Sequence, residues 1–529
     1  MLSDTELVYE IAKKVATFGG KTYYVGGCVR DSIMGIEAKD IDIEVHNIEP
    51  NVLKEILSSF GKLRTQGVSF GVYNLSGRDI DIAQPRQERR IGMKHTDFEV
   101  DVNPYIGEKE AAKRRDFTIG AMMQDVLTGA IVDPYHGLDD LKSGIIRHVN
   151  DVTFQEDPLR VFRAAQFAAR FDYEIASETK SLMKDMDVSM LSCERVYGEM
   201  KKALLKAKKP SKFFEELRSV DKLSDWFEEF IPMIGCEQSA KWHPEGDVWN
   251  HTMATLDFAA KLKSQASNPE FYMLSALCHD MGKPSSWSVD DKGYIHTYNH
   301  EVNGIDVVNT FLNRLNNDKH LRKYVTNMTA QHMKPHHCFD NNLNSSHTNK
   351  MFDESVCPHD LILLATADSA SRGDEIISNY QSEREYLEKK LQSYNICMSR
   401  PEVTGLDLQT IGITPGPIFA DILKMSHDKH LSGVDKSVVL HDIVIDYSKV
   451  FPSVASYRER QKAMIVSGSD LIKLGLTPGP EFKSLLQELN LKLKDGKPKV
   501  EILQELKQQK RLQDLPQFDG NESDTYEFL

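Results

Sequence analysis

The stretch Gly26-Gly27-Cys28-Val29-Arg30-Asp31, with Asp40-Ile41-Asp42 nine residues further on, decides the fold of the N-terminal part of this chain. Two glycines after a strand-like Tyr24-Val25 let the backbone approach a phosphate, and Arg30 can pair with a phosphate oxygen. Asp40 and Asp42, two apart on a predicted strand, project from one face and can hold divalent ions together. Metal-assisted nucleotidyl transfer needs this arrangement, because the metals activate the attacking hydroxyl and neutralise the leaving pyrophosphate.

Short apolar runs separated by turns surround this stretch and predict a mixed sheet with helices. Alternating polarity predicts strands at 24–25, 40–45, 78–82, 130–133 and 145–149. An amphipathic pattern from Thr5 to Phe18 predicts a helix before them. Asp79 and Asp81 share one face of the 78–82 strand, so either could supply a third carboxylate. This α+β head is expected to end near residue 150. From Pro158 onward apolar residues recur with a period of 3.6, which predicts a helical remainder.

The composition limits the function. The 529 residues include 65 Lys+Arg and 79 Asp+Glu, a net charge of −14, which argues against non-specific coating of nucleic acid but leaves room for a basic groove. No run of about 18 apolar residues is present, so we expect no membrane span. The acidic start is unlike a signal peptide, and we expect a cytoplasmic protein. Seven cysteines, never spaced as C-x-x-C, argue against a disulfide framework or a thiolate zinc site.

Three further motifs follow the first constellation in order. They are Arg114-Arg115-Asp116-Phe117-Thr118, Asp133-Pro134-Tyr135-His136-Gly137-Leu138-Asp139-Asp140-Leu141 and Glu156-Asp157-Pro158-Leu159-Arg160-Val161-Phe162-Arg163. With them the sequence resembles the class II tRNA nucleotidyltransferases of the polymerase β superfamily, which comprise CCA-adding enzymes and bacterial poly(A) polymerases. The resemblance covers residues 21 to about 220. It implies a polymerase β-like head, and it implies ATP, CTP and tRNA as binding partners.

The resemblance also implies roles for individual residues. Asp40 and Asp42 would be catalytic and hold Mg²⁺. The nucleotide would be bound by Gly27, Arg30, Arg115, Asp157, Arg160 and Arg163. Positions 157 and 160 are i and i+3 neighbours if both lie on a helix, so a carboxylate and a guanidinium could match a base edge together, or simply pair with each other. Gly120 stands where the family usually has Asn, which is expected to affect efficiency more than identity.

A second constellation lies in the helical middle of the chain. His243-Pro244-Glu245 and His251, then His279-Asp280, then Asp368 resemble the signature of HD-domain phosphohydrolases, as found in one bacterial branch of CCA-adding enzymes. The resemblance implies metal ligands at His251, His279, Asp280 and Asp368. Imidazole and carboxylate groups suit a divalent transition metal such as Ni²⁺ or Mn²⁺. Other polar residues nearby are either outer ligands and phosphate contacts or plain solvated groups: His300, His332, His336, His337 and Lys283.

A segment near the C-terminus occurs twice. Val403-Thr404-Gly405-Leu406-Asp407-Leu408 recurs 63 positions later as Val466-Ser467-Gly468-Ser469-Asp470-Leu471, and the match continues without a gap through Gly433 and Gly496. Each copy is predicted to form a capped short helix, a turn and a second helix. A repeated helical hairpin is the simpler interpretation, and a tail that grips the substrate is the alternative. The last residues, Asp514 to Leu529, are expected to be a frayed tail.

Together these patterns predict four segments, each with its own role. They are a nucleotidyltransferase head at 1–150, a helical neck and body at 151–235, an HD phosphohydrolase domain at 236–400 and a helical tail at 401–529. The expected function is addition or repair of the 3′-terminal CCA of tRNA, with a phosphatase or phosphodiesterase activity at the HD site. The alternatives are a poly(A), A-only or CC-only adding enzyme, and an HD phosphohydrolase with an RNA-binding head. A non-enzymatic RNA chaperone fits poorly with the negative net charge. No sequence feature indicates an obligatory protein partner.

A basic strip is predicted across the neck, from Arg163 and Arg170 to the lysine-rich run at 201–212. Replacing Lys202, Lys206 and Lys209 together by Glu is expected to weaken tRNA binding and to reduce its salt dependence, because phosphate contacts release counterions. Equilibrium binding of tRNA at several salt concentrations checks this. Unchanged affinity and salt dependence would show that the strip does not bind RNA.

Overall fold

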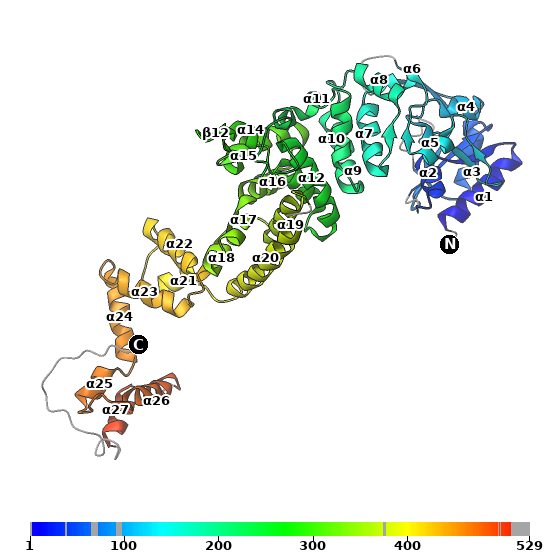
Figure 1. Ribbon diagram of the computed structural model, residues 1–529. Coiled ribbons are helices and arrows are strands. Elements are labelled where there is room, and N and C mark those ends of the chain that lie inside the picture. The colour runs from blue at the N-terminus through cyan, green and yellow to red at the C-terminus, as the bar shows by residue number, and fades with distance from the viewer. Residues whose placement is uncertain are drawn as a thin grey trace. The chain divides into compact units, whose positions relative to one another are not determined.

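A computed structural model of the chain describes residues 3–36, 40–64, 72–90, 98–373, 377–495, 497 and 499–508 (Figure 1). Two compact units are present. The first comprises Met1–Asn342 and Asp353–Glu388, and the second comprises Leu343–Phe352 and Lys389–Leu529. The tail predicted at Asp514 to Leu529 lies outside the described residues. None of the described helices has the length and apolar character needed to cross a membrane.

The N-terminal segment is built around a seven-stranded sheet in the order β3-β4-β5-β2-β1-β8-β9. Its strands are β1 Lys21–Val25, β2 Ile41–His46, β3 Leu63–Arg64, β4 Val72–Leu75, β5 Ile80–Ala83, β8 Met123–Asp125 and β9 Ile131–Val132. β2 and β5 run parallel, and the other neighbours run antiparallel. A hairpin of β6 (Arg86–Arg90) and β7 (Phe98–Val102) forms a separate pair. The strand predicted at 145–149 is shorter, since β10 (Ile145–Ile146) pairs only with β11 (Glu174–Ile175) outside the main sheet.

Helices cover this sheet because their apolar stripes need a partner. The head helices are α1 Asp4–Thr17, α2 Gly27–Ile33, α3 Pro50–Ser58, α4 Gly107–Ala112 and α5 Gly137–Ser143, with a 3₁₀ turn at Thr118–Gly120. α1 starts at a capping box in which Ser3 and Glu6 bond each other's backbone N–H. Apolar residues of α1 and α3 pack against β2, β4 and β5 in one core. The two alanines of α4 pack against β1 in another. Mixed sheet and helices agree with the predicted α+β head.

The remainder of the first unit is almost entirely helical, as predicted. Its helices are α6 Asp151–Gln155, α7 Leu159–Phe171, α8 Ser177–Asp185, α9 Cys193–Lys206, α10 Ser211–Ser219, α11 Ser224–Phe227, α12 Val248–Leu262, α13 Pro269–Cys278, α14 Lys283–Ser286, α15 His300–Leu315, α16 Lys319–Gln331, α17 Met333–Asp340, α19 Pro358–Ala370 and the start of α20 Ile377–Met398. A small hairpin, β12 Ser288–Val289 with β13 Ile295–His296, interrupts them. Phe227 and Phe230 contact Phe311 of α15, and Phe230 also contacts Trp249 of α12. This aromatic core ties the neck to the helices that follow.

In the second unit each copy of the repeat forms the predicted capped short helix, turn and second helix, and a third helix follows each copy. The first copy contains α21 Gly405–Ile411 and α22 Pro417–Leu431 and is followed by α23 Lys436–Tyr447, and the second contains α25 Gly468–Lys473 and α26 Phe482–Lys494 and is followed by α27 Lys499–Gln508. The unit also contains α18 Ser345–Glu354 and α24 Pro452–Met464. Each copy has its own apolar core. The N-caps are Thr404 and Ser467, and Asp407 and Asp470 complete their capping boxes from the third helical position. Each aspartate also pairs with the first residue of the third helix, Lys436 or Lys499.

The central strand contains a buried carboxylate whose replacement tests the fold of the head. Glu44 accepts a hydrogen bond from His46 at 2.9 Å and one from Arg114 at 3.1 Å. Burial alone would raise the pKa of Glu44, but His46, Arg115 and Arg114 outweigh it and lower the pKa to about 2. Because this folded-state pKa lies below the ordinary 4.5, the stabilisation is complete above pH 4.5 and is lost as the pH falls toward 2.

Glu44→Gln is therefore expected to destabilise the head by roughly 3 kcal/mol at pH 7, since it leaves buried cations without a countercharge. Hydrogen exchange of the β2 amides should speed up, and the loss of protection between pH 4.5 and pH 3 should become shallower than in the wild type. Glu10→Gln is the matched control, because Glu10 forms an exposed pair with Lys13. Wild-type protection of β2 in Glu44→Gln would contradict the expectation.

Candidate functional site

The two aspartates predicted to be catalytic lie at the start of β2. Asp42 is on β2 and pairs in register with Asp81 on the parallel strand β5, while Asp40 directly precedes β2. Asp79 is one step before β5, and its carbonyl accepts the backbone N–H of Ile41. Neighbours in register on parallel strands project their side chains to the same face of the sheet. Of the two candidates for a third carboxylate, the register therefore places Asp81 beside Asp42.

The pKa of Asp42 reflects both its burial and the charges of its neighbours. Burial raises the pKa of Asp42, the positive charge of Arg115 works against this, and the negative charges of Asp81 and Asp40 raise it further. The net result is a pKa above the ordinary value, which reflects too little positive charge around Asp42. Oxygen ligands with excess negative charge fit a hard divalent cation such as Mg²⁺.

Next to these aspartates is a pocket of about 210 Å³ rich in arginine. It is lined by Gly26, Gly27, Arg30, Arg115, Asp116, Phe117, Ile119, Gly120, Arg163, Phe167 and Arg170. Gly26 has a φ of +71°, and a Cβ there would lie 3.1 Å from Nη1 of Arg115 and 3.9 Å from Oδ2 of Asp42. The glycine thus lets the loop lie against both groups. Four guanidinium groups around a small opening suit a polyphosphate.

The arginines of this pocket are held by acidic and aromatic partners. Arg30 pairs with Asp31 at 2.6 Å and lies over the ring of Phe171, with 4.8 Å between guanidinium and centroid. Arg163 pairs with Asp116 at 2.6 Å and lies over Phe167. These contacts restrict the rotamers of the side chains before a nucleotide arrives. Of the predicted nucleotide-binding residues, the pocket brings together four: Gly27, Arg30, Arg115 and Arg163.

The other two predicted base-reading residues, Asp157 and Arg160, do not line this pocket. Helix α7 starts at Leu159, so Asp157 precedes the helix and the expected i, i+3 pairing on a helix is wrong. Asp157 instead pairs with Arg195 at 2.8 Å. Arg160 donates to the backbone carbonyls of Thr153 and Arg114 at 2.5 and 2.8 Å. The role of both residues in reading the base stays a prediction.

Sequence reasoning did not assign nucleotide binding to two pocket residues, Phe167 and Arg170. Both lie on α7, four and seven positions after Arg163. This spacing keeps them on one helix face with Arg163, and it was the signal available in the sequence. Gly120, which replaces the Asn usual in the family, also lines the pocket. A Cβ at Gly120 would have its nearest neighbour, Asp116, 3.8 Å away, so the pocket has room for the missing side chain.

The lysine-rich run in the neck is largely occupied by ion pairs. The pairs are Lys201 with Glu270, Lys202 with Glu199, Lys209 with Asp172, and Lys212 with Glu174 and Asp172. Such pairs on a helix surface reduce the positive potential available to a phosphate backbone. RNA contact by this strip stays a prediction.

Three helical elements assemble the second predicted site. His251 comes from α12, His279 and Asp280 follow α13, and Asp368 comes from α19. Nε2 of His251 lies 3.1 Å from Asp368 Oδ1, 3.4 Å from Asp280 Oδ2 and 3.3 Å from Nε2 of His279. All four residues are at most 2% exposed. The four predicted ligands therefore converge on one buried point.

Two further histidines reach the same carboxylate from its other side. Nε2 of His300 and Nε2 of His332 lie 3.3 and 3.5 Å from Asp280 Oδ1. The triads His251–His279–Asp368 and Asp280–His300–His332 each have their ligand atoms within 4.8 Å of one another. By contrast, His336 bonds Asp368 and Glu383, and His337 bonds Asn341 on the surface. Sequence reasoning did not separate these four histidines.

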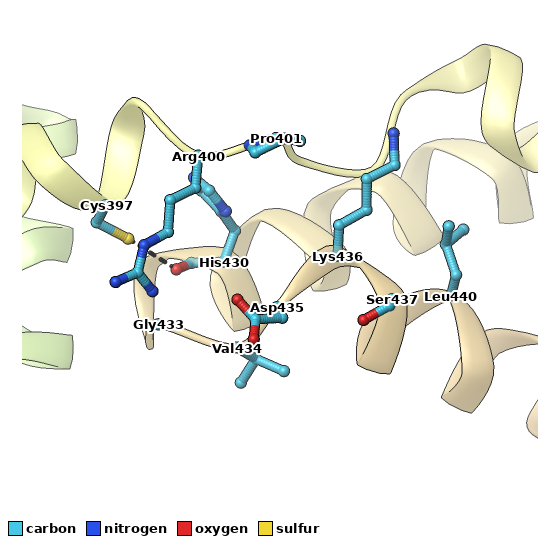
Figure 2. Close-up of a pocket in the computed structure, with 10 residues that line it drawn as sticks. All are labelled: Cys397, Arg400, Pro401, His430, Gly433, Val434, Asp435, Lys436, Ser437 and Leu440. Atoms are coloured by element: carbon cyan, nitrogen blue, oxygen red, sulfur yellow. Dashed lines mark hydrogen bonds between the residues drawn. The ribbon is translucent and has the colours of Figure 1, made fainter. Parts of the chain in front are cut away.

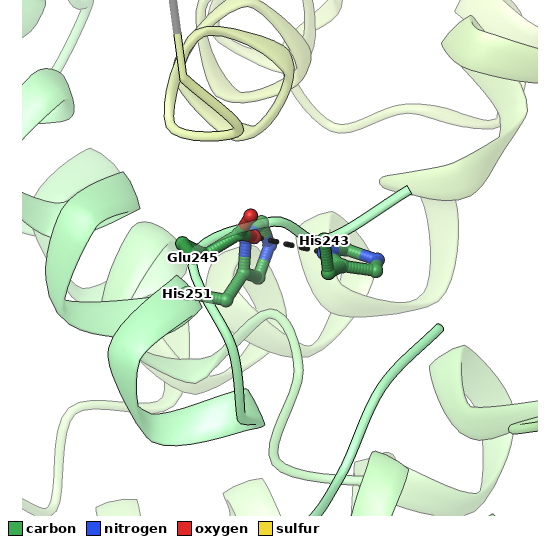
Figure 3. A group of neighbouring side chains, drawn as sticks. All are labelled: His243, Glu245 and His251. Atoms are coloured by element: carbon green, nitrogen blue, oxygen red, sulfur yellow. Dashed lines mark hydrogen bonds and ion pairs between the residues drawn. The ribbon is translucent and has the colours of Figure 1, made fainter. Parts of the chain in front are cut away.

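The histidine rings are oriented by partners on their other nitrogen. Nδ1 of His251 bonds Glu245 at 2.6 Å, and Glu245 also accepts from His243 (Figure 3). Nδ1 of the other three rings bonds the carbonyl three residues earlier in the chain: Ala276 for His279, Thr297 for His300 and Thr329 for His332. A carbonyl or carboxylate only accepts, so each Nδ1 carries the proton and each Nε2 faces the centre. Oriented imidazoles of this kind are typical of metal ligands.

The buried carboxylates of the HD site require positive charge nearby. Neither carboxylate oxygen of Asp280 accepts a hydrogen bond from a described residue, although Nζ of Lys283 lies 2.7 Å from Oδ2. Burial lowers the pKa of His279, but the Asp280 carboxylate outweighs it and raises that pKa. Burial lowers the pKa of His332 to about 4, which keeps this ring neutral, as a ligand must be. Carboxylate oxygens that face the Nε2 atoms of several imidazoles fit a divalent cation.

A close helix approach brings His300 into this group. A Cβ on Gly282 would lie 2.0 Å from the carbonyl oxygen of His300 and 2.6 Å from the backbone nitrogen of Gly304. Only glycine lets the segment after Asp280 lie directly on α15. The structure therefore couples Asp280 and His300 through the backbone as well as through their side chains.

Two family models match the segments of the chain that contain the predicted catalytic aspartates and the HD site. A family model described as the poly A polymerase head domain matches residues 22–147, and an HD domain model matches residues 248–373. The multifunctional CCA protein of Pseudoalteromonas atlantica is 35% identical over 370 residues, which cover 66% of this chain and 86% of that protein. The one from Mannheimia succiniciproducens is 36% identical over 329 residues, 60% of this chain and 76% of its own length.

Solved structures resemble the chain over most of its length. A CCA-adding enzyme in complex with ATP has a TM-score of 0.57 at 19% identity and covers 85% of this chain and 95% of its own. The Thermotoga maritima CCA-adding enzyme in complex with tRNA has a TM-score of 0.55 at 21% identity and covers 84% and 96%. At this identity the likeness establishes the fold. The identity to the curated relatives goes further, and the chain belongs to the family of multifunctional CCA proteins.

Proposed function

We propose that this chain adds or repairs the 3′-terminal CCA of tRNA from CTP and ATP, and that its HD site hydrolyses phosphate esters. The observation that carries the first activity is the position of Asp42 and Asp81 in register beside a pocket with four arginines. The curated relatives are named multifunctional CCA proteins, and solved relatives hold ATP, CTP or tRNA. The substrates proposed here are therefore tRNA, ATP and CTP, for an enzyme that works in the cytoplasm.

In the head, the protein's own groups bind and orient the reactants. Arg30 and Arg115 hold the triphosphate, and the backbone at Gly26 and Gly27 lets it lie close to β2. The tRNA 3′-hydroxyl attacks the α-phosphate of CTP or ATP and pyrophosphate leaves. Mg²⁺ held by Asp40 and Asp42 would lower the pKa of that hydroxyl and offset the charge that develops on the phosphate. Asp81 is proposed as the third carboxylate of this group.

The nucleotide base is proposed to be chosen by protein side chains rather than by a template. Asp157, Arg160 and Arg163 are the proposed base readers. The ion pair of Asp157 with Arg195 and the backbone bonds of Arg160 support a positioned set, because each polar group already has a restrained direction. A single pattern of hydrogen-bond donors and acceptors does not match both C and A. These side chains therefore have to change hydrogen-bond partners between the second addition of C and the addition of A.

At the HD site we propose two divalent ions, of a transition metal such as Ni²⁺ or Mn²⁺. One would be held by His251, His279, Asp280 and Asp368, and the other by Asp280, His300 and His332. Bound there, the ions would activate water for attack at phosphorus. Lys283 and Arg372, which pair with Asp280 and Asp368, would hold the substrate phosphate or the metal-ligand carboxylates in place. We propose that the activities are divided among four segments: the nucleotidyltransferase head at 1–150, the neck and body at 151–235, the HD domain at 236–400 and the helical tail at 401–529.

The first activity is tested with three tRNAs that end before C-C-A, after C and after C-C. With Mg²⁺ and each labelled nucleotide, the wild type is expected to add C, C and A in order and then stop. Asp42→Ala is expected to lower kcat at least a thousandfold, because it removes a metal ligand from the reacting centre. Asp125→Ala, an aspartate on β8 of the same sheet, is the control. Unlimited A addition would make the protein a poly(A) polymerase, and no incorporation would refute the activity.

The second activity is tested by metal content. The wild type loaded with Ni²⁺ or Mn²⁺ is expected to hold about two ions per chain in the HD site, and His300→Ala with His332→Ala about one. Hydrolysis of a 2′,3′-cyclic nucleotide should fall at least a hundredfold, while CCA addition stays at the wild-type rate. His347→Ala replaces an exposed histidine and is the matched control. An unchanged metal content in the double variant would show that His300 and His332 bind no ion.

A further inference from the structure

A pocket in the second compact unit belongs to neither site described above. It has a volume of about 630 Å³, within the range of small-molecule sites. Its lining comes from the end of α20, the following loop, the end of α22 and the start of α23 (Figure 2). The lining residues are Cys397, Arg400, Pro401, His430, Gly433, Val434, Asp435, Lys436, Ser437 and Leu440. The pocket therefore lies at the first copy of the C-terminal repeat.

One residue of this pocket is buried without a polar partner. The His430 side chain is 4% exposed, and neither ring nitrogen forms a hydrogen bond with any residue in the described part of the chain. Its backbone carbonyl accepts from the Cys397 thiol, but that contact leaves the ring free. Because neither ring nitrogen is fully buried, the ring can offer a donor or an acceptor to a molecule in the pocket.

The second copy of the repeat supplies an internal comparison. The two copies align without a gap at an offset of 63, and their capping boxes and Asp–Lys pairs coincide. At the position of His430 the second copy has Leu493, which packs against that copy's apolar core. At the position of Ser437 it has Val500. The three-helix scaffold therefore folds without a histidine or a serine at these positions, and both are free to serve a ligand in the first copy.

The chemistry of the lining indicates the ligand. Arg400 is exposed and, in Figure 2, reaches down past the turn at Gly433, whereas the Lys436 amine points away and pairs with Asp407 at 2.7 Å. Pro401, Val434 and Leu440 add apolar surface to the lining, against which a flat ring can pack. The Asp435 carboxylate does not cap α23, so it can accept from an amino or imino group.

We propose that this pocket binds one nucleotide. Its base packs against this apolar surface with its donors toward Asp435 and His430, and its phosphate pairs with Arg400. The nucleotide is either a free mononucleotide or an unpaired nucleotide of bound RNA. The lining residues of this pocket differ from those of the nucleotidyltransferase pocket. The second copy of the repeat lacks the site, because Leu493 and Val500 stand at the positions of His430 and Ser437. Binding of an RNA nucleotide rests on the proposed function in tRNA processing. CCA addition by the wild-type protein, measured alongside the binding experiments, tests that function separately.

The test uses the full chain and the variant Arg400→Ala, His430→Leu. His430→Leu copies the residue of the second repeat, so folding should be preserved and a thermal unfolding midpoint checks this. Lys424→Ala, an exposed cation on α22 that does not line the pocket, is the charge-matched control. If RNA is the source, tRNA affinity should fall about tenfold in the double variant but not in the control.

A second measurement separates the sources. Photolabelling with 8-azido-ATP, followed by peptide mapping, should mark a peptide within residues 397–440 if free nucleotides bind, and the label should vanish in the double variant. Labelling with unchanged tRNA affinity supports the free nucleotide, and a tenfold loss of tRNA affinity without labelling supports RNA. A folded double variant with tRNA affinity within twofold of wild type, together with no label in this peptide of the wild type, would overturn the proposal.

Discussion

Buried carboxylates that require positive charge organise the first compact unit. Glu44 has no exposed area and draws in His46 and Arg114, a residue 70 positions away. Asp280 lies among imidazoles from three other helices. Taking a carboxylate out of water costs several kcal/mol unless cations surround it, so each of these residues selects the arrangement of the segments around it. The HD site is therefore part of the core, and the exposed Asp40 and the half-buried Asp42 lie just before Glu44 along the chain.

In the head, the strands of the site could be predicted from the sequence, but their pairing could not. Alternating polarity gives the face on which Asp79 and Asp81 lie, since it depends only on the neighbours along one strand. Which of the two lies beside Asp42 depends on the register with β2, and register is set by the packing of the whole sheet. The strand predicted at 145–149 is longer than the observed β10 for a related reason. His148 forms a bridge to Phe117 instead of extending the pairing of β10 with β11.

At the HD site, the resemblance to HD-domain phosphohydrolases implied four ligands, yet the sequence could not rank the remaining histidines. His300, His332 and His336 are chemically identical, and only the approach of α15 to Gly282 decides that His300 faces Asp280. Asp157 shows the opposite limit, because it lies just before the first turn of α7 and pairs with Arg195 rather than with Arg160. Helix ends are the least certain part of a sequence-based prediction, and an i, i+3 argument fails when one member lies outside the helix.

The two C-terminal copies have complete and separate apolar cores. Each copy has a capped first helix beside its own core, so the two copies are not interleaved in sequence. Unequal recombination could therefore add or delete a 63-residue unit and leave the catalytic segments untouched. Duplication of this kind relaxes selection on one copy at a time. The chain thus contains a natural route by which its C-terminal end can acquire new binding properties while the enzyme keeps working.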